Sequence, residues 1–205
     1  MTGGSSGARP RAWQRMLSGR RLDLLDPHPD DISVDDIAHG LARVARWNGQ
    51  TRGAHAFSVA QHSVLVEDIA AALDPTLSRQ ARLAVLLHDA PEYVIGDLIS
   101  PFKAAIGFDY KAFEHRLSAA IHARFRLPHP ITSVLYAAIK RADRIAAYYE
   151  ATGLAGFDDE EGRLYFGPVE SLGGTLGETL VSLQAMSVGE AQSAFLERFR
   201  MLVGT

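Results

Sequence analysis

Residues 84–103 read AVLLHDAPEYVIGDLISPFK. The stretch opens as an apolar helix, yet it sets His88 and Asp89 side by side at its centre, and Glu92 and Asp97 follow shortly after. Acidic side chains are costly to bury and need a partner when they are buried. The stretch therefore predicts a polar cluster inside the fold, whose acidic groups are paired with a partner from outside the stretch.

Amphipathic helical patterns extend on both sides of this stretch. Ser33 and Ser78 stand where N-caps are expected, and Pro91 is expected to bend or break its helix because proline lacks an N–H donor. The residues 152–168 are acidic and contain glycine, which indicates a loop. The expected helices cover residues 31–47, 58–73, 78–96, 109–126, 131–151, 168–186 and 188–203.

No convincing alternating pattern of strands interrupts these helices. We therefore expect an all-α fold, a single-domain helical bundle over residues 21–205. Its motif-bearing core would cover about 33–150, and its C-terminal helices would cover 168–203. Residues 1–20, rich in glycine, serine and basic side chains at their start, are expected to form a flexible leader.

Composition excludes several classes of function. The 205 residues contain 47% hydrophobic residues, enough for a sizeable core, and carry a net charge of −3. That charge argues against broad electrostatic binding to nucleic acid or to an anionic membrane. Cysteine is absent, so any metal ion must be held by imidazole and oxygen. Without a secretory signal or a membrane-spanning stretch, a cytoplasmic location is expected.

Two more ligand-type residues accompany the His-Asp pair. His62 lies in the apolar segment FSVAQHSVLV, and Asp143 lies in the middle of the helical pattern AAIKRADRIAAYY. By itself His88-Asp89 is as readily explained as a core histidine satisfied by its neighbour. Three separate helices with two imidazoles and two carboxylates instead indicate a site for one divalent ion, of Zn, Mn, Co, Fe or Ni.

The order H…HD…D, formed by His62, His88-Asp89 and Asp143, resembles the HD-domain metal-dependent phosphohydrolases. The continuation LLHDAPE, then Gly-Asp-Leu at 96–98 and Pro-x-Lys at 101–103, is similar to the bacterial 5′-deoxynucleotidase-like branch. The resemblance covers roughly residues 33–150 and implies that these four residues are the metal ligands.

The same resemblance implies roles for neighbouring residues. Glu92 can orient or deprotonate the attacking water, and Asp97 can contact the sugar and assist proton transfer. Arg46 can bind phosphate oxygens through its guanidinium group, and Trp47 offers a flat face to a sugar or base. Against these roles, Glu92 can support a helix end, and a tryptophan at a helix end is often part of a core.

Several cations surround the expected site in the sequence. Lys140, Arg141 and Arg144 flank Asp143, and the sequence leaves open which of them faces a phosphate. Lys103 is a further substrate-binding candidate.

The function expected is release of orthophosphate from a deoxynucleoside 5′-monophosphate, with this small-molecule nucleotide as the partner. The basic residues are dispersed in the sequence, which favours a monophosphate over a triphosphate. The alternative enzyme is a deoxynucleoside triphosphate triphosphohydrolase, and the alternative of another class is a non-catalytic, metal-containing helical binding module. A zinc protease is disfavoured because Glu92 stands where the H-E-x-x-H motif has its second histidine. A homodimer is one oligomeric state left open.

Overall fold

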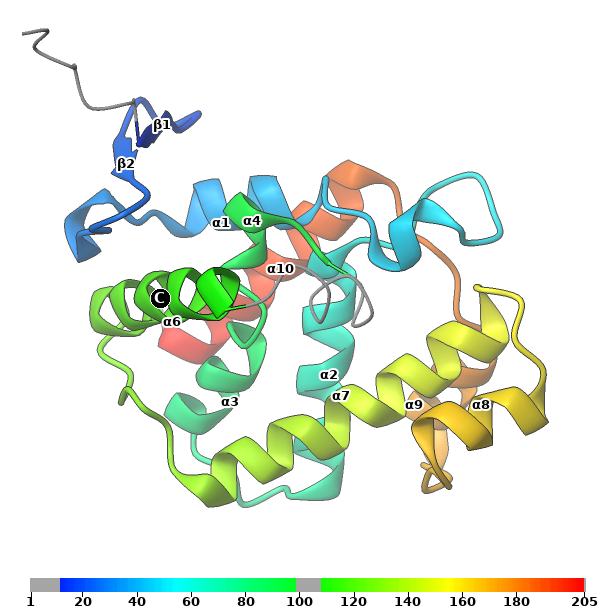
Figure 1. Cartoon of the computed structure of the whole chain (residues 1–205). Coiled ribbons are helices and arrows are strands. Elements are labelled where there is room, and N and C mark those ends of the chain that lie inside the picture. Colours follow the sequence, from blue (N-terminus) through cyan, green and yellow to red (C-terminus); the bar gives the residue numbers. More distant parts are fainter. Residues whose placement is uncertain (1–11, 99–107, 205) are drawn as a thin grey trace, which may run out of the picture.

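Helix α2 (Val59–Leu73) lies at the centre of the structure (Figure 1). The computed structural model describes residues 12–98 and 108–204. The helix begins at Ser58, whose hydroxyl oxygen accepts a hydrogen bond from the backbone N–H of Gln61, and it is buried over most of its length. The helices that pack most closely against it are α3 (Arg79–Leu86), α7 (Ser133–Gly153) and α10 (Val188–Val203).

Two apolar cores share α2. The first joins the start of α2 to the helices α1 (Val34–Leu41), α3, α6 (Phe108–Arg124) and α10. The second joins the later part of α2 to α7 and to α9 (Gly174–Val181). A helix that is packed along most of its length is fixed by its neighbours, so a side chain that it carries is held in one place.

A buried ion pair adds to the packing of α2. The carboxylate of Glu67 is fully buried and accepts hydrogen bonds from Arg82 of α3 and Arg198 of α10. Arg198 also binds Asp68 at 2.7 Å. Ion pairs as well as apolar packing therefore hold α2, α3 and α10 together.

The helix expected over 78–96 is broken. It begins after Ser78 as predicted, but α3 ends at Leu86, and a separate short helix, α4 (Glu92–Ile95), follows. Between them the N–H of Ala90 donates to the carbonyl of Leu87 at 3.0 Å, in an i→i+3 turn. Pro91 has no N–H that could donate to that carbonyl in a continuous α-helix. The sequence had indicated a break in this helix, and the structure places the end of α3 five residues before the proline.

A small hairpin precedes the helices. Its strands β1 (Trp13–Arg15) and β2 (Arg21–Asp23) pair antiparallel, and the short 3₁₀ helix Pro29–Asp31 follows. Met16 and Leu22 are buried in the first core. Residues 12–20 of the segment expected as a flexible leader are therefore structured, while residues 1–11 of that segment lie outside the described residues.

The expected loop over 152–168 was also wrong in part. It contains α8 (Asp159–Phe166), which begins with a capping box in which Asp158 and Glu161 bind each other's backbone N–H groups. Of the pattern over 168–186, α9 forms only residues 174–181, whereas α10 has the expected bounds 188–203. The all-α, single-domain prediction is confirmed. No helix in the described part of the chain is long and apolar enough to cross a membrane.

Candidate metal centre

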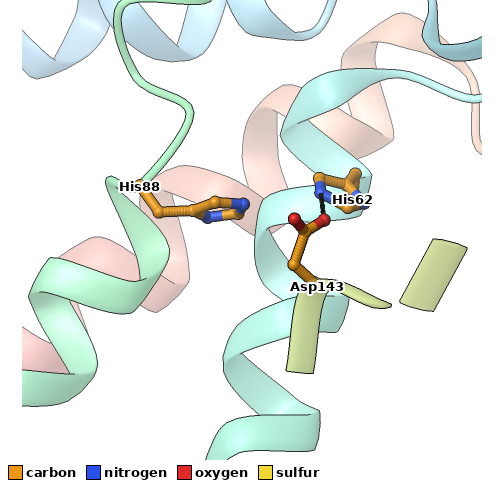
Figure 2. A group of neighbouring side chains, drawn as sticks. All are labelled: His62, His88 and Asp143. Carbon is orange, nitrogen blue, oxygen red and sulfur yellow. Dashed lines mark ion pairs between the residues drawn. The ribbon is translucent and has the colours of Figure 1, made fainter. Parts of the chain in front are cut away.

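Three ligand-type side chains meet where α2, the turn after α3, and α7 come together. His62, His88 and Asp143 place their donor atoms within 4.8 Å of one another (Figure 2). Nε2 of His62 is 3.3 Å from Oδ1 of Asp143. Asp89 joins them, since its Oδ2 lies 3.4 Å from Nε2 of His62 and 3.1 Å from Nε2 of His88. The four residues expected as ligands are therefore neighbours in space.

Two consecutive residues on the turn after α3 take part. On a continuous α-helix, His88 and Asp89 would point about 100° apart. Here the backbone N–H of His88 donates to Val85 at 3.1 Å and that of Glu92 to Asp89 at 3.0 Å, both i→i+3 bonds outside regular α-helix. Nε2 of His88 and Oδ2 of Asp89 nevertheless lie 3.1 Å apart, and the same Asp89 oxygen is 3.4 Å from Nε2 of His62.

The hydrogen bonds of the two imidazoles direct their Nε2 atoms into the cluster. Nδ1 of His88 lies 2.8 Å from the carbonyl oxygen of Val85, which can only accept, so Nδ1 carries the hydrogen. Nδ1 of His62 lies 2.5 Å from Oε1 of Glu150. Both Nε2 atoms are buried and lack a hydrogen-bond partner of good geometry among the described residues. Buried polar atoms of this kind are rare, and this donor set suits a divalent transition metal.

Glu150 also belongs to the candidate site, although it was not expected from the sequence. It is fully buried on α7, two helical turns after Asp143. Its Oε2 accepts hydrogen bonds from Nε1 of Trp47 at 2.9 Å and from Nε of Arg46 at 3.2 Å, while its Oε1 faces His62. Burial raises the pKa of Glu150, but Arg46 and His62 outweigh burial and lower it to about 2. The sequence signal for Glu150 was that a glutamate follows a candidate ligand by seven residues in an apolar helix.

The carboxylates of the cluster are held in their charged forms. Burial raises the pKa of Asp143 and Asp89, but the imidazoles of His62 and His88 outweigh it and lower both pKa values well below the ordinary range. Burial and Arg46 lower the pKa of His62, but Glu150, Asp143 and Asp89 raise it well above 6.5.

Arg46 and Trp47 lie in a 3₁₀ segment (Arg46–Gly49) rather than at a helix end. Trp47 has φ 57° and Asn48 has φ 50°, in the left-handed region that bulky residues rarely adopt. The hydrogen bond from Trp47 to Glu150 and an ion pair of 3.2 Å between Arg46 and Asp97 hold the segment in this conformation. Strained backbone that is held by buried polar contacts is typical of functional sites.

A cavity of about 1020 Å³ opens beside the cluster. Glu92 is buried in its wall, and Lys140 lies there with its Nζ 3.3 Å from Oδ2 of Asp143. Arg144 also lines the cavity, whereas Arg141 forms an exposed ion pair with Glu170. The expected site residues that line the cavity are Arg46, Trp47, Asp89, Glu92, Asp97, Lys140 and Asp143.

Lys103, which was also expected to bind substrate, lies outside the described residues. Three aromatic side chains that the sequence reasoning did not select also line the cavity: Phe157, Tyr165 and Phe166. They come from the segment that was expected to be a loop, so their common orientation could not be recognised.

Comparison with known proteins finds two relatives. The chain is 59% identical over 157 residues to an uncharacterized protein of Rhodobacter capsulatus, covering 77% of this chain and 80% of the relative. It is 31% identical over 188 residues to the uncharacterized protein YfdR of Escherichia coli, covering 92% of this chain and 94% of YfdR. No protein-family model matches the chain.

Proposed function

This chain belongs to the family that contains YfdR and its Rhodobacter capsulatus relative, and we propose that it is an HD-domain metal-dependent phosphohydrolase that acts on nucleotides. One observation carries the proposal. The cluster of two imidazoles and two carboxylates adjoins a large cavity whose wall also holds cationic and aromatic side chains. Such a cavity suits a ligand with an anionic end and a flat apolar end.

His62, His88, Asp89 and Asp143 would hold one divalent ion. When bound, such an ion polarises a phosphate oxygen and acidifies a water molecule. Glu92 supplies a carboxylate at the cavity wall, only 3% exposed and three residues after Asp89, where it can take a proton from the water.

The cationic residues divide into fixed and adaptable groups. Arg46 is held between Glu150 and Asp97, and these carboxylates raise its pKa despite its burial, so it stays charged in a defined orientation. Lys140 has a half-exposed side chain and can follow the phosphate. Arg46 would thus orient the phosphate group, and Lys140 and Arg144 would neutralise it.

The charge of the cavity favours a monophosphate. Among the residues that the structure describes, three formally positive and five formally negative side chains line it, so one divalent ion would balance this part of the lining: Arg46, Lys140 and Arg144 against Asp89, Glu92, Asp97, Asp143 and Glu161. A triphosphate would bring more negative charge than a monophosphate to this described lining, which has no excess of cations. The cations do converge in space, however, so their dispersion in sequence no longer argues against the triphosphate alternative.

A product analysis tests this proposal. Metal-loaded protein is incubated with deoxynucleoside mono-, di- and triphosphates, and the products are separated by chromatography. Nucleoside and orthophosphate released from a monophosphate are the expected result. Inert monophosphates with tripolyphosphate released from a triphosphate would replace the proposal with the triphosphohydrolase. Absence of hydrolysis with every substrate and several divalent ions would leave a metal-containing binding module.

A further inference from the structure

Helix α8 and the residue before its cap bring three aromatic rings to one side of the cavity. We name Phe157, Tyr165 and Phe166 the aromatic wall. Phe157 lies 6.0 Å from Tyr165 and 6.3 Å from Phe166 between ring centroids, and Tyr165 remains 67% exposed. A large ring that is exposed beside a cavity still has a face on which a ligand can be buried.

The aromatic wall is held firmly in place by close packing between α8 and α7, which lie side by side (Figure 1). A Cβ atom at Gly162 would be only 2.7 Å from Cγ2 of Thr152 and 2.9 Å from a ring carbon of Tyr148, so the helices approach as closely as glycine allows. The hydroxyl of Tyr148 also donates to Asp159 at 2.9 Å. A wall fixed in this way needs little ordering when a ligand binds.

Helix α7 relates the aromatic wall to the metal centre. Lys140, Asp143, Arg144 and Ala147 line the cavity at positions i, i+3, i+4 and i+7, which form one stripe of a helix. The charged residues occupy the first part of this stripe and Ala147 its last part, next to the turn at which α8 packs. The cavity thus changes from charged to apolar along α7.

Trp47 connects the two ends. Its indole N–H is bound by Glu150 of the metal centre, while its ring lies 5.7 Å from Phe157 and 5.9 Å from Phe166. The polar groups that α8 contributes to the described lining are the hydroxyl of Tyr165 and the carboxylate of Glu161, which accepts a hydrogen bond from the N–H of Asp158. The apolar end therefore offers mainly ring faces.

We propose that the aromatic wall is the subsite that binds the nucleobase of the substrate by stacking, with Tyr165 as its main contact. This inference rests on the proposed function, because it takes the phosphate end of the ligand to lie at the metal centre. Stacking on an aromatic side chain depends on the flat face that every base has.

The test compares a substrate that has a base with one that lacks it. Tyr165→Ala should raise KM for a deoxynucleoside 5′-monophosphate about 10-fold and leave KM for 2-deoxyribose 5-phosphate unchanged. Tyr165→Phe, which keeps the ring, should behave as the parent. Leu164→Ala is the matched control, since Leu164 is 74% exposed on the same helix and does not line the cavity. An unchanged KM for the nucleotide, or equal rises for both substrates, would overturn the proposal.

A binding measurement separates this proposal from the proposed function. Calorimetric titration with a deoxynucleoside, which has no phosphate to release, should show binding to the parent and to Tyr165→Phe and weaker binding to Tyr165→Ala. This result would support the aromatic wall even if no nucleotide is hydrolysed. Equal binding to the parent and to Tyr165→Ala, or no binding to the parent, would refute it even if phosphate is released.

Discussion

Replacing Glu150 with glutamine would test whether this buried carboxylate positions the metal centre. Glutamine keeps the size of the side chain and can still accept the hydrogen bond from Trp47. It removes the negative charge that faces His62 and Arg46. Arg46 would then keep its ion pair with Asp97 but lose the fully buried partner.

The magnitude of the stability loss follows from the pKa. Folding lowers the pKa of Glu150 from 4.5 to about 2. At about 1.4 kcal/mol per pKa unit, the charged form contributes about 3 kcal/mol to stability at neutral pH. The pKa is depressed on folding, so this contribution is fully present above pH 4.5 and is lost as the pH falls toward 2. We therefore expect Glu150→Gln to lower the free energy of unfolding by about 3 kcal/mol.

Metal affinity should fall separately. The carboxylate fixes the ring of His62 and holds the hydrogen on Nδ1, so its removal should weaken metal binding by about 10- to 100-fold. Chemical denaturation of the metal-free protein gives the first quantity, and calorimetric titration with Zn²⁺ or Mn²⁺ gives the second.

Glu67→Gln is the matched control for this experiment. Glu67 is also fully buried and also pairs with arginine, but its partners belong to α3 and α10 and not to the metal centre. Both variants should lose stability, and only Glu150→Gln should lose metal affinity. If Glu150→Gln binds metal as tightly as the parent, or if Glu67→Gln weakens binding to the same extent, the positioning role is refuted.

Three other predictions concern the metal, the proton transfer and the packing of α8. Protein purified without added metal should contain about one divalent transition-metal ion per chain, and His88→Ala should lose it; elemental analysis showing an equally loaded variant would contradict the ligand assignment. Glu92→Gln should keep fold and metal but lose phosphate release by about 100-fold or more, and retained turnover would leave Glu92 with a structural role alone. Gly162→Ala should lower the free energy of unfolding by about 1–3 kcal/mol because its Cβ would clash with Thr152, whereas Gly153→Ala, with nothing within 4 Å, should not; equal denaturation curves for the two variants would argue against the close packing.

Local sequence signals predicted where helices begin better than where they end. Ser78, expected as an N-cap, accepts a hydrogen bond from the backbone N–H of Ala81, whereas Ser33, the other expected N-cap, stands just before α1 without a capping hydrogen bond from its side chain. The end of α3 was harder to place because it depends on i→i+3 bonding upstream of Pro91. Helix α8 was missed although Asp158 and Glu161 have capping-box spacing, because the acidic and glycine content of that segment indicated a loop.

The candidate metal ligands could be selected from sequence because their residue types and order are distinctive. Glu150 could not, because its importance depends on Arg46 and Trp47, which lie more than 100 residues away in the chain. No local sequence pattern indicates that an acidic residue in an apolar helix will contact an arginine from a distant 3₁₀ segment. The aromatic wall likewise required the position of α8 to be known.

The two acidic residues of α7 contact the two different nitrogens of one imidazole ring, and this limits the changes in length that the helix can tolerate. Asp143 faces Nε2 of His62 and Glu150 faces its Nδ1. Inserting or deleting one residue between them would rotate Glu150 by about 100° and shift it by about 1.5 Å along the helix. Substitutions on the outer face of this segment can accumulate, but a change of length would separate the two acids from their shared histidine. Single-residue insertions placed here should therefore be far more damaging than the same insertions in the exposed turn between α2 and α3.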